Sequence, residues 1–242
     1  MDGKHVVILK PAKSGSTYLN YKQTFSMVLM AVADAHYKFL YVNVGGQGRI
    51  SDGGVFAKCK LAEAMEKNTL NFPEPSTLPN AASAVLVPYL VVADDAFPLR
   101  PNIMKPFPRR QLSEKERIYN YRLSRACRVV ENAFGILANK FRVFKSPIAL
   151  KQSTVRSIVL ATVCLHNFLC EKQLASSNAA ADEEDDLDEL ENSCENSGLQ
   201  DISAAFGTGR ASTDAKVVRN TLVEYFFGAG AVDWQRKYAG LE

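Results

Sequence analysis

Three acidic residues far apart in the sequence, Asp2, Asp94 and Glu131, are of the type that binds divalent metal ions. Mg²⁺ and Mn²⁺ prefer carboxylate and water oxygens, and a few protein carboxylates leave room for phosphate oxygens. Two such ions, about 3.5–4 Å apart, can activate a water or a 3′-hydroxyl for attack on a phosphodiester. The spacing therefore points to phosphoryl chemistry, provided that the fold brings the three side chains together.

Each residue also has a purely structural interpretation. Glu131 lies inside a predicted helix beside apolar residues, where burial is costly unless the charge is paired or binds a metal, and Arg128 offers an ion pair one turn away. Asp94 follows an apolar stretch and is suited to capping a loop. Carboxylates from two strands and one helix converge only if the helix crosses the strand ends.

Charge is unevenly distributed along the chain. The net charge of +3 includes ten acids between residues 182 and 201, where Lys and Arg are absent. Residues 100–142 carry eleven Lys and Arg against three Glu. Such a basic stretch favours polyanions, although a solvated helix face has the same composition. The residues we expect to contact DNA are Arg100, Lys105, Arg109, Arg110, Arg122, Arg125 and Arg128.

Hydrophobic patterning predicts a series of strands followed by helices. A capping box, Ser113 with Glu116, opens the longest predicted helix, and an acidic stretch poor in large apolar residues predicts a disordered linker. The predicted strands are 1–8, 26–33, 39–44 and 84–93, the last buried on both faces, and the helices are 51–67, 113–142, 153–171, buried all round, and 215–234.

This order predicts an α/β protein, a mixed sheet flanked by helices, and is compatible with an RNase H-like fold. The 242 residues are 47% hydrophobic, an ordinary globular balance. The start of the chain has no leader pattern, and the strongly apolar stretches are shorter than a membrane span, so we expect a soluble intracellular protein without a membrane partner. Five cysteines without a C-x-x-C pair predict free thiols, and three scattered histidines leave oxygen ligands for any metal.

Six ordered sequence blocks carry a resemblance to a known family. Over about residues 2–171 the chain resembles the DDE superfamily endonuclease domain of PIF/Harbinger transposases, and the closing Tyr225-Phe226 and Trp234-Gln235 resemble tails in that family. The blocks are Asp2-Gly3-Lys4-His5-Val6, Gly48-Arg49-Ile50-Ser51-Asp52, Ala93-Asp94-Asp95-Ala96-Phe97-Pro98-Leu99-Arg100-Pro101, Asn120-Tyr121-Arg122-Leu123-Ser124-Arg125-Ala126, Val129-Val130-Glu131-Asn132-Ala133-Phe134-Gly135 and Cys164-Leu165-His166-Asn167-Phe168-Leu169.

The resemblance implies an RNase H-like core and a catalytic, metal-binding triad of Asp2, Asp94 and Glu131. It places Asp95 at a Ser position and Asp52 at a helix start, and we expect both to support the triad rather than to bind the metal. We expect His166 and Asn167, on the last predicted helix of the domain, to form structural hydrogen bonds. The expected domains are a DDE endonuclease domain (1–174), an acidic disordered linker (175–214) and a C-terminal helical tail (215–242).

The start of the chain departs from the family pattern. Family members have a helical or DNA-binding region and several apolar residues before the first Asp, whereas Met1 directly precedes Asp2 here. We therefore expect a chain truncated at its N-terminus, with a shortened first strand and a frayed Asp2.

Three hypotheses follow. The first is a metal-dependent endonuclease that uses Mg²⁺ or Mn²⁺ to cleave DNA in the nucleus, with the cytoplasm as the alternative location. The second is a catalytically inactive, transposase-derived protein that binds DNA or a protein. The third is an incomplete gene model. The resemblance also implies a separate Myb-like DNA-binding protein as a candidate partner.

Overall fold

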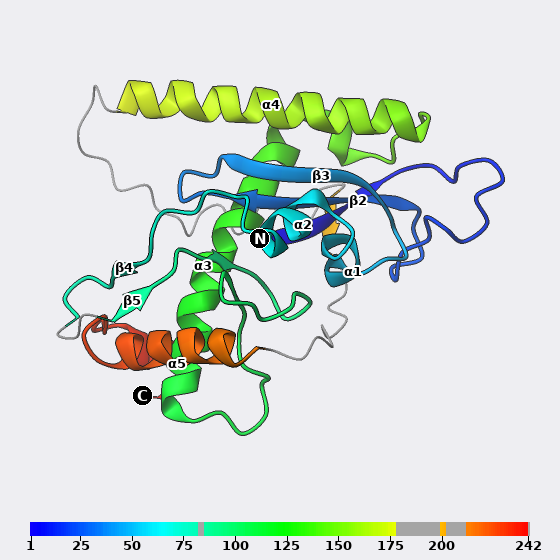
Figure 1. The fold of residues 1–242 in the computed structure, drawn as a ribbon. Helices are drawn as coiled ribbons and strands as arrows, with labels where there is room; N and C mark the ends of the chain where they lie inside the picture. The colour runs from blue at the N-terminus through cyan, green and yellow to red at the C-terminus, as the bar shows by residue number, and fades with distance from the viewer. Residues whose placement is uncertain (82–84, 178–198, 202–211, 242) are drawn as a thin grey trace. The chain divides into compact units, whose positions relative to one another are not determined.

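The computed structural model describes residues 1–81, 85–177, 199–201 and 212–241 (Figure 1). The chain forms two compact units, each drawing on two stretches of sequence. The first unit consists of Met1–Val55 and Val129–Ser203, and the second of Phe56–Arg128 and Ala204–Glu242. Both units draw on residues from either side of the boundary predicted at residue 174, and the three-domain division stays a prediction.

A four-stranded antiparallel sheet is the framework of the first unit. Its strands are β1 (Asp2–Val7), β2 (Ser26–Ala33), β3 (Phe39–Gln47) and β8 (Leu199–Asp201), in the order β3-β2-β1-β8. The predicted hairpin of residues 26–33 and 39–44 is confirmed. Asp34 closes its turn, since one carboxylate oxygen accepts the backbone N–H groups of His36 and Lys38.

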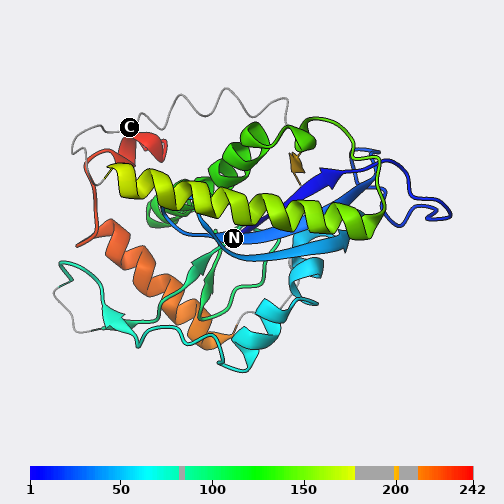
Figure 2. The same ribbon diagram turned by 90° about the horizontal axis from the view of Figure 1, so that it is seen from above.

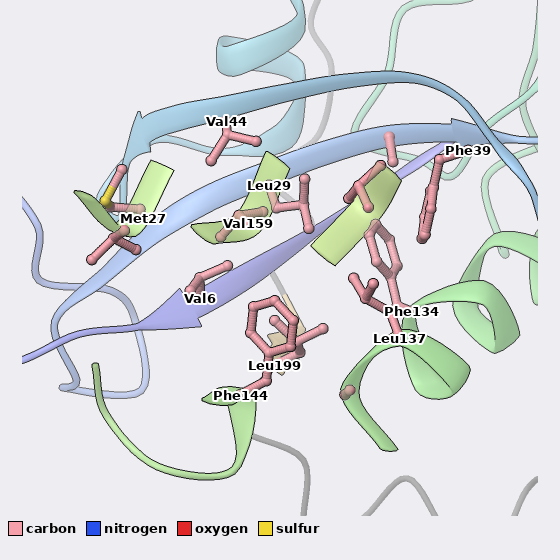
Figure 3. Packing of buried hydrophobic residues seen from close by; sticks show 14 of the residues in the cluster. Val6, Met27, Leu29, Phe39, Val44, Phe134, Leu137, Phe144, Val159 and Leu199 are labelled. Carbon is pink, nitrogen blue, oxygen red and sulfur yellow. The ribbon is translucent and has the colours of Figure 1, made fainter. Parts of the chain in front are cut away.

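Two helices cover one face of this sheet. They are α4 (Gln152–Ser177) and the second half of α3 (Glu114–Lys140), which is followed by the short 3-10 helix η1 (Arg142–Lys145). Figures 1 and 2 show α4 lying over the sheet and running roughly alongside β2 and β3. Alternate residues of a strand point to one face, so Met27, Leu29 and Ala31 enter the same core as Phe134 of α3 and Val159 of α4 (Figure 3).

The outer face of α4 is exposed, so the prediction of a helix buried all round is wrong. Val155, Val159 and Val163 are buried, whereas Leu165 and Phe168 are 52% and 53% exposed. By length and composition alone, Gln152–Ser176 would be able to cross a membrane, with 33% of that window buried. Because its valine stripe packs in the core of the sheet, we interpret α4 as a core helix with an apolar outer face.

The predicted role of His166 and Asn167 as structural residues is confirmed. The Asn167 side chain accepts the Phe39 backbone N–H at 2.8 Å and donates to the Phe39 carbonyl at 2.9 Å. The His166 Nε2 lies 2.8 Å from the Tyr37 carbonyl oxygen, and burial lowers the pKa of its imidazole. The pair therefore attaches α4 to the start of the edge strand β3.

The second unit contains helices and short strand pairs. Its helices are the first half of α3, α2 (Lys60–Glu66), α5 (Thr213–Phe227) and α6 (Gln235–Tyr238). The short helix α1 (Asp52–Phe56) belongs to the first unit except for its last residue, Phe56, where the second unit begins. Its strands are β4 (Ser76–Thr77), β5 (Leu86–Val87), β6 (Val91–Val92) and β7 (Ile103–Met104). The pairs are β4 with β5, antiparallel, and β6 with β7, parallel.

Two predicted elements of this region are divided. The helix predicted over 51–67 breaks between α1 and α2, where the Cys59 sulfur accepts the Ala62 N–H as the cap of α2. The strand predicted over 84–93 becomes β5 and β6, with different partners and partly exposed residues. Pro88 lies between them, and because proline has no N–H it interrupts a strand ladder.

The capping box at the start of α3 is confirmed, since Ser113 Oγ and backbone N–H both donate to Glu116 Oε2, at 2.8 and 2.9 Å. Most of the predicted linker, 178–198 and 202–211, lies outside the described residues. Between these ranges, β8 pairs with β1, Leu199 is buried in the core, and Gln200 Oε1 accepts a hydrogen bond from Thr24 at 3.0 Å. That part of the segment is therefore a strand.

Replacing Asn167 by Ala should destabilise the first unit. The variant removes two hydrogen bonds and leaves both Phe39 backbone groups without this partner, a loss of about 1–3 kcal/mol. Urea denaturation measures the change, and Asn220→Ala on the exposed surface of α5 is the matched control. Equal urea midpoints for the two variants would contradict the role of Asn167 in attaching α4 to β3.

Candidate metal centre

Asp2 is an ordered strand residue, so the expectation that it is frayed is wrong. It pairs with Ala31 of β2 in the antiparallel ladder, and the neighbouring Met1 is 5% exposed. The Asp2 side chain is 17% exposed, with Lys4 Nζ at 3.9 Å from its Oδ2. The long β1–β2 pairing therefore fixes the first predicted carboxylate despite its place at the start of the chain.

Asp52 supplies a second carboxylate next to Asp2. It is the first residue of α1, it is 1% exposed, and one of its oxygens lies within 4.8 Å of an Asp2 oxygen. After β3 the chain passes close to the start of β2 at Gly48, where a Cβ would lie 2.4 Å from the Tyr18 carbonyl oxygen and 2.7 Å from that of Ser26. Only glycine thus lets the chain after β3 pack this closely against the start of β2.

The Asp2–Asp52 pair fits a divalent cation by its donor chemistry. Two ionised carboxylates so close repel each other, and removing Asp52 from water adds a desolvation penalty. A cation bound between the oxygens offsets both effects, and hard oxygen ligands favour Mg²⁺ or Mn²⁺. Sequence reasoning assigned Asp52 a supporting role because a Ser-Asp pair is typical of a helix start; the geometry makes it a candidate ligand equal to Asp2.

Asp94 lies in the second unit, just after β6, in a turn that its own side chain stabilises. Its Oδ1 accepts the backbone N–H of Ala96 at 3.0 Å, so the loop-capping interpretation of Asp94 holds. The preceding Ala93 extends the parallel ladder, donating its N–H to the Met104 carbonyl at 2.9 Å. Asp94 and Asp95 are both partly buried.

Lys105 fastens this turn from the inside. Its ammonium donates to the carbonyl oxygens of Asp95 and Phe97, at 2.8 and 3.0 Å, and burial lowers the pKa of this group. Sequence reasoning assigned Lys105 to DNA contact on charge alone. The contacts show that it holds the backbone that carries Asp94, and its contact with DNA stays a prediction.

Glu131, the third predicted carboxylate, lies on α3 in the first unit and is exposed. Among the described residues it is not grouped with Asp2 and Asp52 at the 4.8 Å distance. The apolar residues predicted beside Glu131 are buried, as Val130, Ala133 and Phe134 show. Glu131 follows Val130 by about 100° around the helix, which turns it away from that core.

The seven predicted DNA-contacting residues fall into two groups. Arg109, Arg110, Arg125 and Arg128 are exposed. The others have contacts within the second unit: Arg100 pairs with Glu66 at 2.8 Å, and Arg122 donates to Gly230 O and Gln235 Oε1 at 3.3 and 3.2 Å. Lys105 belongs to this second group, whose charges serve the packing of the unit.

The fold and the acid pair define an α/β protein with a candidate divalent-metal centre at the start of its first strand. Residues 1–167 match the DDE superfamily endonuclease family, and the chain belongs to that family. It is 27% identical over 176 residues to "Protein ALP1-like" of Arabidopsis thaliana, covering 72% of this chain. The chain spans 43% of the length of that relative. No solved structure matches the chain.

These matches confirm the family resemblance identified from the sequence blocks, that of the DDE endonuclease domain of PIF/Harbinger transposases. Endonuclease domains of this family use divalent metals, and the Asp2–Asp52 pair is a candidate site for such a metal.

Replacing Lys105 by Met should loosen the turn that carries Asp94. The variant keeps the aliphatic stem but removes two charge-assisted hydrogen bonds, so the amides of Ala96 and Phe97 should exchange with solvent deuterium about tenfold faster or more. Hydrogen exchange by NMR or mass spectrometry measures this change.

The matched control is Lys67→Met, which removes an exposed ion pair to Glu63 in α2 of the same unit. Unchanged exchange at Ala96 and Phe97 in the Lys105 variant would show that the lysine does not hold the turn.

Proposed function

We propose that this chain is a metal-dependent endonuclease that cleaves phosphodiester bonds of DNA. The observation that carries the proposal is the pair of carboxylates, Asp2 and Asp52, held within 4.8 Å in a chain of the DDE endonuclease family. A bound Mg²⁺ or Mn²⁺ supplies Lewis-acid polarisation of the phosphate and lowers the pKa of a water.

Asp94 is the third ligand in this proposal, with Asp2 and Asp52. Lys105 then has a defined task, which is to keep the Asp94 turn in one conformation. Glu131 keeps its predicted place as a further acid of the site, contributed by α3.

The exposed arginines provide the proposed electrostatic contact to the DNA backbone. Arg109, Arg110, Arg125 and Arg128 are exposed and spread over the loop before α3 and its first half. Phosphate contacts of this kind position a duplex without reading its sequence. A nuclear location follows from the DNA substrate, and a Myb-like protein is the proposed partner that would supply sequence recognition.

A non-catalytic role in DNA or protein binding is the second candidate. It is favoured by the exposed position of Glu131 outside the Asp2–Asp52 pair. In that case the chain would bind DNA in a salt-dependent manner without metal-dependent turnover.

Cleavage of supercoiled plasmid with Mn²⁺ or Mg²⁺ distinguishes the two candidates. The endonuclease proposal predicts nicking that EDTA abolishes and that Asp2→Asn, Asp52→Asn or Asp94→Asn reduces by about two orders of magnitude, because each variant removes a charged ligand. Glu131→Gln should also reduce the rate if α3 contributes an acid.

Asp214→Asn is the matched control, since Asp214 is an exposed aspartate in the first turn of α5 with no part in the proposed site. It should retain the wild-type rate within about threefold. Cleavage that survives both EDTA and Asp52→Asn would exclude the proposed centre, whereas salt-dependent binding without any cleavage would support the non-catalytic candidate.

A further inference from the structure

An arginine anchors the C-terminal segment to α3 in the second unit. Arg122 donates to the Gly230 carbonyl and to Gln235 Oε1, and Gln235, 3% exposed, donates to the Phe226 carbonyl at 2.8 Å. The Arg122 guanidinium also lies 4.8 Å from the ring centroid of Phe226, and burial lowers its pKa. The residues after α5 are therefore held in a defined conformation.

This anchoring presents a cluster of three aromatic rings, Tyr121, Trp234 and Tyr238, which we name the aromatic platform. The Tyr121 and Tyr238 rings are nearly parallel, 6° apart in plane with centroids at 6.0 Å. Trp234 meets both edge-on, at 6.0 and 6.5 Å. Trp234 is 38% exposed and Tyr238 60%, so the rings lie at the surface although they are fixed in position.

Positive charge surrounds the platform. The Arg125 guanidinium lies 4.6 Å from the Trp234 centroid, and Lys237 Nζ lies 5.9 Å from that of Tyr238. Both residues are exposed. Arg236 is neutralised by its ion pair with Glu114 at 2.5 Å, and Asp233 is the acid next to Trp234 in sequence. Exposed rings bordered by cations attract a ligand that has both flat π-faces and negative charge.

Unpaired DNA has these properties, because its bases stack on aromatic side chains and its phosphates pair with arginine and lysine. A duplex hides its base faces and engages only the cations. We propose that the aromatic platform binds single-stranded DNA, with a base stacked on Tyr238 and the backbone beside Arg125 and Lys237. This inference rests on the proposed function for its substrate class, but it needs no metal and no cleavage.

The test uses Trp234, the only tryptophan of the chain, as a reporter inside the platform. The full-length protein is titrated with an oligothymidylate in EDTA, so that neither metal binding nor catalysis contributes. Binding should quench Trp234 fluorescence. An abasic oligonucleotide of equal length and charge should quench far less, because it offers phosphates without bases.

Variants then separate stacking from charge. Tyr238→Ala should weaken oligothymidylate binding about tenfold or more, whereas Tyr238→Phe should retain the wild-type affinity within about twofold, since stacking needs the ring and not the hydroxyl. Lys237→Glu should weaken binding and reduce its salt dependence. Tyr89→Ala, at a 47% exposed tyrosine lining a different pocket of the same unit, is the matched control and should have no effect.

Absence of quenching, equal quenching by the abasic strand, or unchanged affinity of Tyr238→Ala would each overturn the proposal. A chain that binds oligothymidylate through Tyr238 but cuts no plasmid would retain the platform and lose the endonuclease function. A chain that cuts plasmid but whose Trp234 fluorescence is not quenched by oligothymidylate would retain the endonuclease function and lose the platform. The failure of one proposal is therefore distinguishable from the failure of the other.

Discussion

The mutual repulsion of Asp2 and Asp52 is the constraint on which the site depends. If both are ionised at the 4.8 Å limit, their repulsion is about 3–4 kcal/mol at the effective dielectric constant of a protein surface. Folding nevertheless brings them together, with Asp2 held in the β1–β2 register and Asp52 at the start of α1. Lys4, 3.9 Å from Asp2 Oδ2, offsets part of this repulsion, and a divalent cation between the two carboxylates would offset more of it.

Several basic residues of this chain have a structural role in the fold. Lys105 holds the Asp94 turn and Arg122 holds the C-terminal segment, both through hydrogen bonds to backbone carbonyls. Part of the positive charge in residues 100–142 is therefore engaged in contacts within the second unit. The same contacts give these residues an indirect role, because each fixes a group with a proposed function: the Asp94 carboxylate in one case and the aromatic platform in the other.

Features governed by local sequence were predictable. The β2–β3 hairpin and the Ser113 capping box follow from strand pattern, turn residues and capping chemistry. Features that depend on partners distant in the sequence were not predictable from it. The division of residues 84–93 depends on β4 and β7, and the exposed face of α4 depends on which side meets the sheet. The strand β8, which pairs with β1, belongs to a segment whose acidic composition predicted disorder.

The candidate site shows the same distinction. Family blocks identified Asp2, Asp94 and Glu131, but the proximity of Asp52 to Asp2 is a tertiary contact, which spacing along the chain does not reveal. Glu131 was placed correctly beside an apolar stripe, yet the direction of its side chain depends on how α3 packs in the first unit. Sequence thus identified the acids, and tertiary packing determines which of them meet.

A crystal structure grown with Mn²⁺, with anomalous diffraction at the manganese edge, tests the central claim most directly. The account predicts an anomalous peak about 2.0–2.4 Å from carboxylate oxygens of Asp2, Asp52 and Asp94. A map with no peak at the Asp2–Asp52 pair, or a peak there with the Asp94 carboxylate remote from it, would contradict the proposed centre.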